Sequence, residues 1–101
     1  MANTILTVNV SGGSAPFSIK ASLYKGAEFI LGLTSPGSFE HEFKNLTGDY
    51  TILVSGPNPL GPGGKTTITL DTSSITLEPD SDITPTTRTG KAYLANFHFK
   101  A

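Results

Sequence analysis

Glycine and proline divide this sequence into short stretches, and this punctuation limits what the chain can fold into. The 101 residues include 11 Gly and 7 Pro. Between these turn-forming residues apolar side chains alternate with polar ones, and no segment keeps a helical period over more than two turns. Alternation with a period of two is the pattern of a strand that buries one face. The chain is therefore predicted to be all-β.

Seven or eight short stretches fit this pattern. Residues 4–10 show the alternation most regularly, and the third stretch is expected to place Phe29, Leu31 and Leu33 on one face. Short antiparallel strands separated by turn signals favour a β-sandwich. The remaining stretches predicted as strands are 17–24, 28–33, 39–43, 50–54, 65–70, 74–77 and 91–101.

The length fits a single domain, predicted to span residues 1–101. Within it, residues 1–70 form the predicted core, and residues 71–101 form a C-terminal extension with a polar loop and a final strand. Phe97 and Phe99 align on one face of that strand. An exposed apolar edge would invite aggregation, so the strand is expected in the sheet interior or against a partner.

Charge and composition exclude several classes of function. The formal net charge of −1 gives no basic field for nucleic acid, and the absence of Cys excludes disulfides and thiolate metal sites. The chain has no apolar run of about 18 residues, so membrane insertion is not expected. The N-terminus lacks the pattern of a signal peptide. An excised module would be extracellular or at the cell surface, and a whole protein would be cytoplasmic or part of a virion.

Two segments carry a family resemblance. The sequence reads "VSGGSAPFSI" at residues 10–19 and "FKNLTGDYTILVSG" at residues 43–56. This pairing resembles the SprB-type repeat of Bacteroidetes surface adhesins, which is similar to PKD and other immunoglobulin-like modules. Residues 71–101 have no counterpart in the repeat. The residues that match its pattern are Gly12, Gly13, Pro16, Phe17, Leu46, Gly48, Tyr50, Ile52 and Val54.

The resemblance implies an immunoglobulin-like sandwich that is extracellular and not an enzyme. Gly12 and Gly13 are expected at positive φ, where glycine is not penalised. Pro16 fixes its own φ and extends the residue before it, so that Phe17 enters the core at the start of a strand. Gly48 is expected in a turn, together with Asp49.

Tyr50 is the aromatic residue of the second segment. It is expected to be buried, with its hydroxyl bonded to nearby backbone as in a tyrosine corner.

Four titratable residues on predicted strands are candidates for catalysis or metal binding. His41 and His98 are far apart in the sequence and form no ligand set, so both are predicted to be structural or surface residues. Glu40 and Glu42 lie on the outward face of one strand, whereas an acid–base pair needs a cleft, so both are predicted to be solvated surface residues. No catalytic residue and no metal ligand is predicted.

The acidic loop "EPDSD" is the remaining candidate for a cation. Its oxygen ligands, Glu78, Asp80 and Asp82, are of the kind that calcium takes. The EF-hand spacing is absent and Pro79 restrains the backbone, so a solvated loop is favoured and no cofactor is predicted.

The sequence favours a module for adhesion or ligand binding at a surface, with a protein, a glycan or copies of itself as partner. The predicted contact residues lie on loops that a rigid sandwich would display. Tyr24, Tyr93 and the Phe residues are a further candidate, as a sugar-stacking platform on one sheet. The loop residues predicted to bind are Asn58, Asp80, Asp82 and Arg88.

One alternative stays open. The chain would then be a structural or assembly subunit, such as a virion decoration protein or a secretion-machine accessory. Its C-terminal strand would pair with a neighbouring subunit by β-augmentation.

Overall fold

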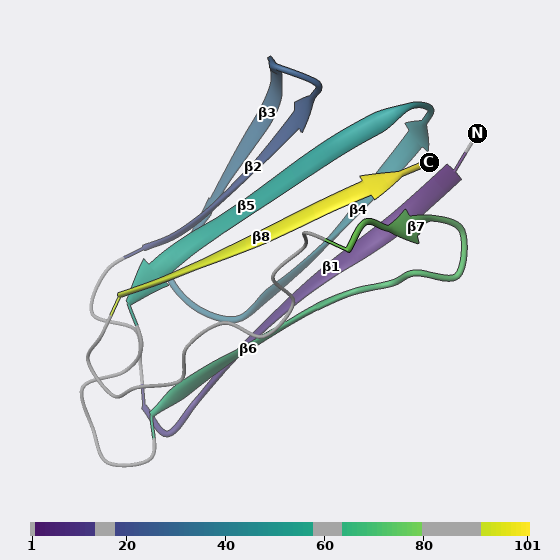
Figure 1. The fold of residues 1–101 in the computed structure, drawn as a ribbon. Helices are drawn as coiled ribbons and strands as arrows, with labels where there is room; N and C mark the ends of the chain where they lie inside the picture. Colours follow the sequence, from purple (N-terminus) through teal and green to yellow (C-terminus); the bar gives the residue numbers. More distant parts are fainter. Residues whose placement is uncertain (1, 14–17, 58–63, 80–91) are drawn as a thin grey trace.

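The protein folds into two antiparallel sheets packed face to face (Figure 1). The structure is a computed structural model that describes residues 2–13, 18–57, 64–79 and 92–101. No helix occurs among these residues. The strands are β1 (Ala2–Ser11), β2 (Ile19–Lys25), β3 (Glu28–Ser35), β4 (Phe39–Leu46), β5 (Asp49–Pro57), β6 (Lys65–Leu70), β7 (Thr76–Leu77) and β8 (Ala92–Lys100).

The order of the strands is that of an immunoglobulin-like sandwich, which confirms the predicted fold. One sheet has the order β4-β1-β6 and the other has the order β3-β2-β5-β8-β7. Strands β1 to β5 and β8 occupy the positions of strands B, C, C′, E, F and G of an immunoglobulin domain. Strand β6, although it comes late in the chain, pairs with β1 at the position of strand A. The connection between β5 and β8 therefore supplies a strand to the opposite sheet.

Glycines at positive φ make the predicted turns. Gly12 and Gly13 have φ values of 78° and 133°, and Gly48 has a φ of 108°, as expected from the sequence. These conformations are costly for any residue with a Cβ atom. Pro16 and Phe17, the next residues of the same predicted motif, lie outside the described residues.

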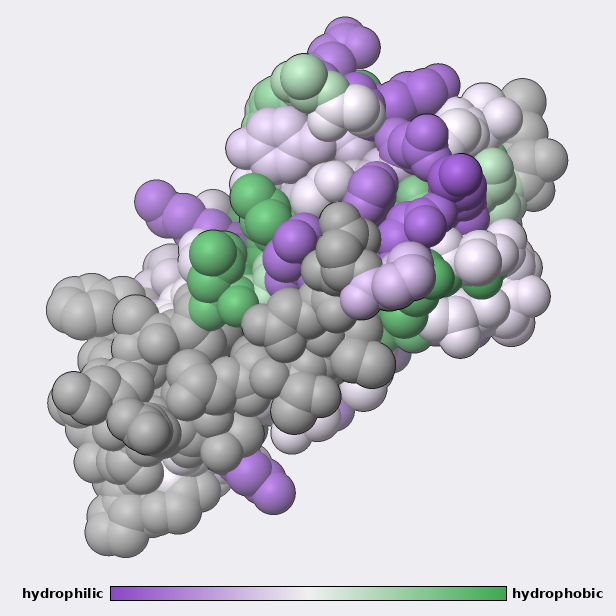
Figure 2. Space-filling view, viewed as in Figure 1, coloured by the Kyte–Doolittle hydropathy of each residue, from purple (hydrophilic) through white to green (hydrophobic). Residues whose placement is uncertain are grey.

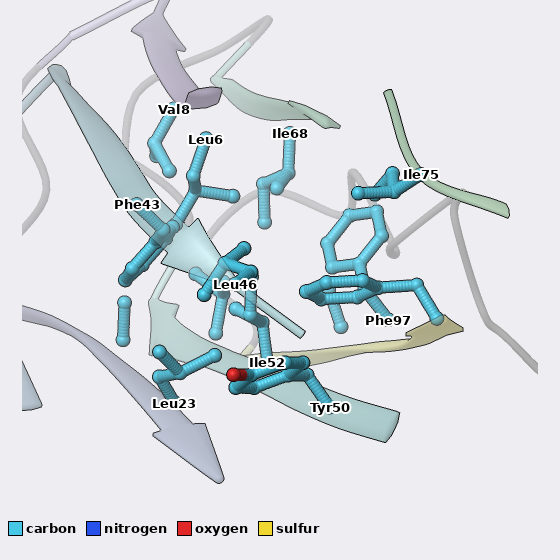
Figure 3. Packing of buried hydrophobic residues seen from close by; sticks show 14 of the residues in the cluster. Leu6, Val8, Leu23, Phe43, Leu46, Tyr50, Ile52, Ile68, Ile75 and Phe97 are labelled. Carbon is cyan, nitrogen blue, oxygen red and sulfur yellow. The ribbon is translucent and has the colours of Figure 1, made fainter. Parts of the chain in front are cut away.

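The core is a single apolar layer between the two sheets, and Figure 3 shows side chains from both sheets meeting there. Each strand contributes alternate residues, because successive side chains point to opposite faces. The most deeply buried side chains include Leu6, Val8, Ile19, Leu23, Ile52, Val54, Phe97 and Phe99.

Tyr50 forms the predicted tyrosine corner at the start of β5. Its side chain is 6% exposed, and its hydroxyl oxygen accepts a hydrogen bond of 3.1 Å from the backbone N–H of Thr47. The ring stacks on Phe99 of β8 with centroids 5.6 Å apart. The corner therefore links the β4–β5 turn to the last strand of the chain.

Strand β8 lies inside the five-stranded sheet, as predicted. It pairs with β5 along all of its 9 residues, and β7 pairs with its C-terminal end at Phe99 and Lys100. Both ends of the described chain then lie at the β4–β5 turn (Figure 1). Ala2 lies opposite Leu46, and the N–H of Ala101 donates a 2.9 Å hydrogen bond to the carbonyl of Gly48.

Candidate binding face

One extra residue in β3 turns Phe29 to the outer face of the five-stranded sheet. Leu23 of β2 lies opposite Leu31, but the next residue, Tyr24, lies opposite Phe29, so Ile30 is left over as a β-bulge. The expectation that Phe29 shares a face with the leucines after it is therefore wrong. A shift of one residue reverses the face on which a side chain lies, and Phe29 is 57% exposed.

Phe29 forms an aromatic pair with Tyr24 on this face. The ring centroids are 5.6 Å apart and the ring planes meet at 70°, which is an edge-to-face arrangement. The Phe29 ring lies over its own strand and covers Gly32, three residues further along the chain. A Cβ atom at Gly32 would come within 3.3 Å of the ring carbon Cζ. The missing side chain of Gly32 thus makes room for the exposed ring.

Polar side chains continue the row that this aromatic pair begins. Thr51 of β5 lies next to Tyr24, and His98 of β8 lies next to Thr51. Among the outward positions of the described strands in this sheet, charged side chains occur near the strand ends, at Lys20, Asp49 and Lys100. The middle of the face therefore has no Lys, Arg, Asp or Glu side chain, and it includes the exposed ring of Phe29 and the half-buried ring of Tyr24.

Few large hydrophobic side chains are exposed on the described part of the molecule, and they do not form one continuous patch. On the side shown in Figure 2, hydrophobic residues form small separate areas among hydrophilic and neutral ones. Within the described part of the chain, the large hydrophobic side chains that are exposed are Phe29, Ile30 and Leu94. Leu94 lies on the same sheet face as Phe29, at the other end of the strands.

A groove of about 210 Å³ opens between the edge strands β3 and β4. Leu23, Phe43, Leu46 and Tyr50 line its inner part, and they lie together in Figure 3. His41 is at the rim, where its ring meets that of Phe43 edge to face at 4.8 Å.

The rim of the groove also carries an ion pair on β4. Lys44 and Glu42 pair at 3.6 Å with side chains 65% and 42% exposed. An ion pair this exposed contributes little to stability.

The structure keeps the two histidines apart. His41 is on β4 and His98 is on β8, in different sheets. Glu40 and Glu42 are exposed on β4, as predicted. Within the described residues, no three His, Asp or Glu side chains gather in a way that would hold a metal ion.

The sequence also predicted a set of binding residues on loops. Asn58, Asp80, Asp82 and Arg88 lie outside the described residues. Glu78, the first residue of the acidic loop motif, pairs with Lys100 at 3.8 Å.

Asp71 is held in a turn directly after β6. The backbone N–H of Ser73 donates a 2.9 Å hydrogen bond to Oδ1 of Asp71. This bond, with a smaller effect of the Ser73 hydroxyl, lowers the pKa of Asp71 below its ordinary value of 3.8. The turn is also tied to β1, because the hydroxyl of Thr4 donates a 2.6 Å hydrogen bond to the Asp71 carbonyl.

One sequence feature of this region is its lack of charge. Residues 29–39 carry no charged side chain, although they include the exposed residues Phe29 and Ile30. A charge-free run is unusual for a strand at the edge of a sheet. The placement of Phe29 itself depends on the bulge, which alternation along one strand does not reveal.

The chain matches no protein-family model, no curated protein and no solved structure. The resemblance to the SprB-type repeat therefore depends on the motif residues alone. Across the described ranges, no helix has the length and hydrophobicity needed to cross a membrane.

Proposed function

We propose that this chain is a non-enzymatic, immunoglobulin-like binding module that contacts a protein or glycan on a surface through the outer face of its five-stranded sheet. The observation that carries the proposal is the aromatic pair formed by the exposed ring of Phe29 and the half-buried ring of Tyr24. The resemblance to surface adhesin repeats supports the same class of function.

The physical argument rests on what exposed rings and uncharged polar groups do together. An aromatic ring buries a large area at low cost in conformational entropy, so rings are common anchors at binding surfaces. The hydroxyl groups of Ser22 and Thr51 lie close by and both donate and accept hydrogen bonds. A face with rings and hydroxyl groups suits the apolar side of a sugar ring or an apolar anchor of a protein.

The experiment is a binding screen against glycan arrays and surface proteins, followed by affinity measurements with the ligand found. Phe29→Ser should weaken binding at least about tenfold, because truncating an anchor residue typically costs this much. The matched control is Leu94→Ser, since Leu94 is 59% exposed on the same face. Leu94 lies four residues before His98, roughly 13 Å along the strand, so its loss should leave the affinity unchanged.

Two results would contradict the proposal. One is a ligand whose affinity survives Phe29→Ser, and the other is an equal loss in both variants. Unfolding midpoints of both variants, measured in parallel, separate lost contacts from lost folding.

The assembly alternative has one supporting observation and one constraint. In its favour, no described strand pairs with β8 before Phe99 on the side away from β5. The constraint is that Phe97 and Phe99 are almost fully buried in the core. Deleting residues 92–101 should therefore unfold the domain, and truncation cannot separate assembly from folding. The solution mass over a concentration series tests assembly directly.

A further inference from the structure

Strand β3 is the free edge of the five-stranded sheet. Among the described strands it pairs with β2 alone. In Figure 1 the β2–β3 hairpin extends beyond the neighbouring strands at the upper edge of the view. A strand with one neighbour leaves half of its backbone N–H and C=O groups without a partner in the sheet. Those groups are a template for another strand.

Most side chains of β3 do little to block such pairing. Natural edge strands usually carry charged side chains or proline; β3 has a charge only at its first residue, Glu28, and residues 29–35 have neither. Ile30 is 43% exposed, and Leu31 is only partly buried. Both line the groove between β3 and β4. The bulge at Ile30 protects one end of the strand, which leaves Leu31–Ser35 regular.

The edge of the other sheet near this groove is protected in the usual way. Strand β4 carries Glu40, Glu42 and Lys44 as exposed residues, and its regular pairing with β1 is interrupted near Asn45, which has a φ of 59°. A two-fold pairing of β4 with another β4 about His41 would place Glu40 opposite Glu42 of the other copy. Like charges directly opposite each other are destabilising.

We infer that β3 pairs antiparallel with β3 of a second copy of this chain, about a two-fold axis near Gly32. A two-fold operation requires a self-complementary surface, and β3 provides one. In this register Leu31 lies opposite Leu33 of the other copy, and no charged side chains oppose each other. The two five-stranded sheets become one continuous sheet. This inference concerns the strand edge and goes beyond the ligand-binding face.

A second copy fits this edge better than a charged peptide does. Residues 29–39 offer no charge for a basic or acidic segment to pair with. In the proposed register, the exposed part of Leu31 would instead be covered by Leu33 of the second copy, and Ile30 would lie opposite Thr34. The interface involves few residues, so a concentration-dependent dimer is expected rather than an obligate one.

The test is the solution mass of the intact chain by light scattering after size exclusion, up to about 1 mM, where even weak association is populated. The wild-type mass should rise from one chain to two. Thr34→Lys puts a charge on the exposed side of β3 and should weaken dimerisation at least about tenfold. The matched control is Thr67→Lys, an exposed position on the edge strand β6, which should dimerise like the wild type.

Hydrogen exchange at low and high concentration locates the contact. The backbone amides of residues 31–35 should gain protection in the wild type at high concentration, and they should not in Thr34→Lys. Thermal unfolding of both lysine variants at low concentration checks that the monomer still folds. A single-chain mass over the whole range would overturn the inference, and so would equal weakening by both variants or protection at another strand. The ligand-binding proposal has its own measurement, the affinity of Phe29→Ser for its ligand, so failure of the dimer and failure of ligand binding are distinguishable.

Discussion

Strands β3 and β8 are both rich in apolar residues, yet their aromatic side chains have opposite fates. In β8, Phe97 and Phe99 are 1% and 0% exposed, whereas Phe29 in β3 is 57% exposed. Strand β8 has β5 on one side and β7 on part of the other, and its alternation is unbroken. Strand β3 has one neighbour and a bulge. Whether an aromatic side chain is buried thus depends on the pairing register of its strand and on the place of that strand in the sheet, as well as on the local sequence.

The largest expected difference is between alanine substitutions of one phenylalanine in each strand. Phe97→Ala should lower the free energy of unfolding by about 3–5 kcal/mol, because it empties a fully buried site. Phe29→Ala should change it by less than about 0.5 kcal/mol, as is usual at the surface. Urea unfolding of the two variants measures both. Similar losses in both would mean that Phe29 is buried and that the contrast between the strands is wrong.

Tyr50 tests how far the buried region extends toward the β4–β5 turn. Tyr50→Ala should cost about 3–5 kcal/mol of unfolding free energy, since the ring is buried and stacks on Phe99. Tyr50→Phe keeps the ring and removes the bond from Thr47, so about 1 kcal/mol is expected. Chemical denaturation of the pair separates packing from hydrogen bonding. If Tyr50→Ala hardly changed the free energy of unfolding, Tyr50 would not form a stabilising tyrosine corner.

Gly26 tests the turn of the exposed hairpin. It lies between β2 and β3 at a φ of 61°, with no atom near the position of a Cβ. Gly26→Ala should therefore cost about 1–2 kcal/mol through backbone conformation alone. Gly37→Ala is the control, because Gly37 has equal space and no positive φ, and it should be close to neutral. Thermal unfolding compares the two, and equal midpoints would contradict the assigned conformation.

The smallest effect is expected from Asp71, on the other side of the molecule. Its pKa is lower in the folded state than the ordinary value of 3.8, so the charged form stabilises the fold. That contribution is present above pH 3.8 and is lost as the pH falls through the folded-state pKa. Asp71→Asn keeps an acceptor for Ser73 but does not titrate. The difference in stability between wild type and variant should therefore narrow below pH 3.8, and a constant difference would contradict the assignment.

The sequence was sufficient for features that depend on neighbouring residues. Alternation located the strands, glycine located the turns at positive φ, and the family resemblance carried by Leu46, Gly48 and Tyr50 implied the tyrosine corner. Each of these is a local property of the backbone or of one strand face. The fold class followed from the number and spacing of the strands.

Features that depend on pairing between distant strands were not predictable. The bulge at Ile30 exists only relative to β2, so the reversal of Phe29 was missed. The place of β6 beside β1 depends on contacts more than 50 residues apart, such as Leu6 with Leu70. The candidate face was anticipated only in part: Tyr24 and the Phe residues were a candidate platform on one sheet, but the outward placement of Phe29 depends on the bulge relative to β2.

The meeting of both chain ends at the β4–β5 turn determines how the domain would respond to mechanical tension. Ala2 lies opposite Leu46, and Ala101 is bonded to Gly48. A force between these two ends would load the first hydrogen bonds of β1 and the last ones of β8 one at a time, as in opening a zipper. In a domain whose ends lie at opposite poles, by contrast, the force acts along the strands and loads many hydrogen bonds at the same time. This domain would therefore unfold at a low force if it were stretched between its two ends. If it were attached through one end only, tension would not pass through its strands.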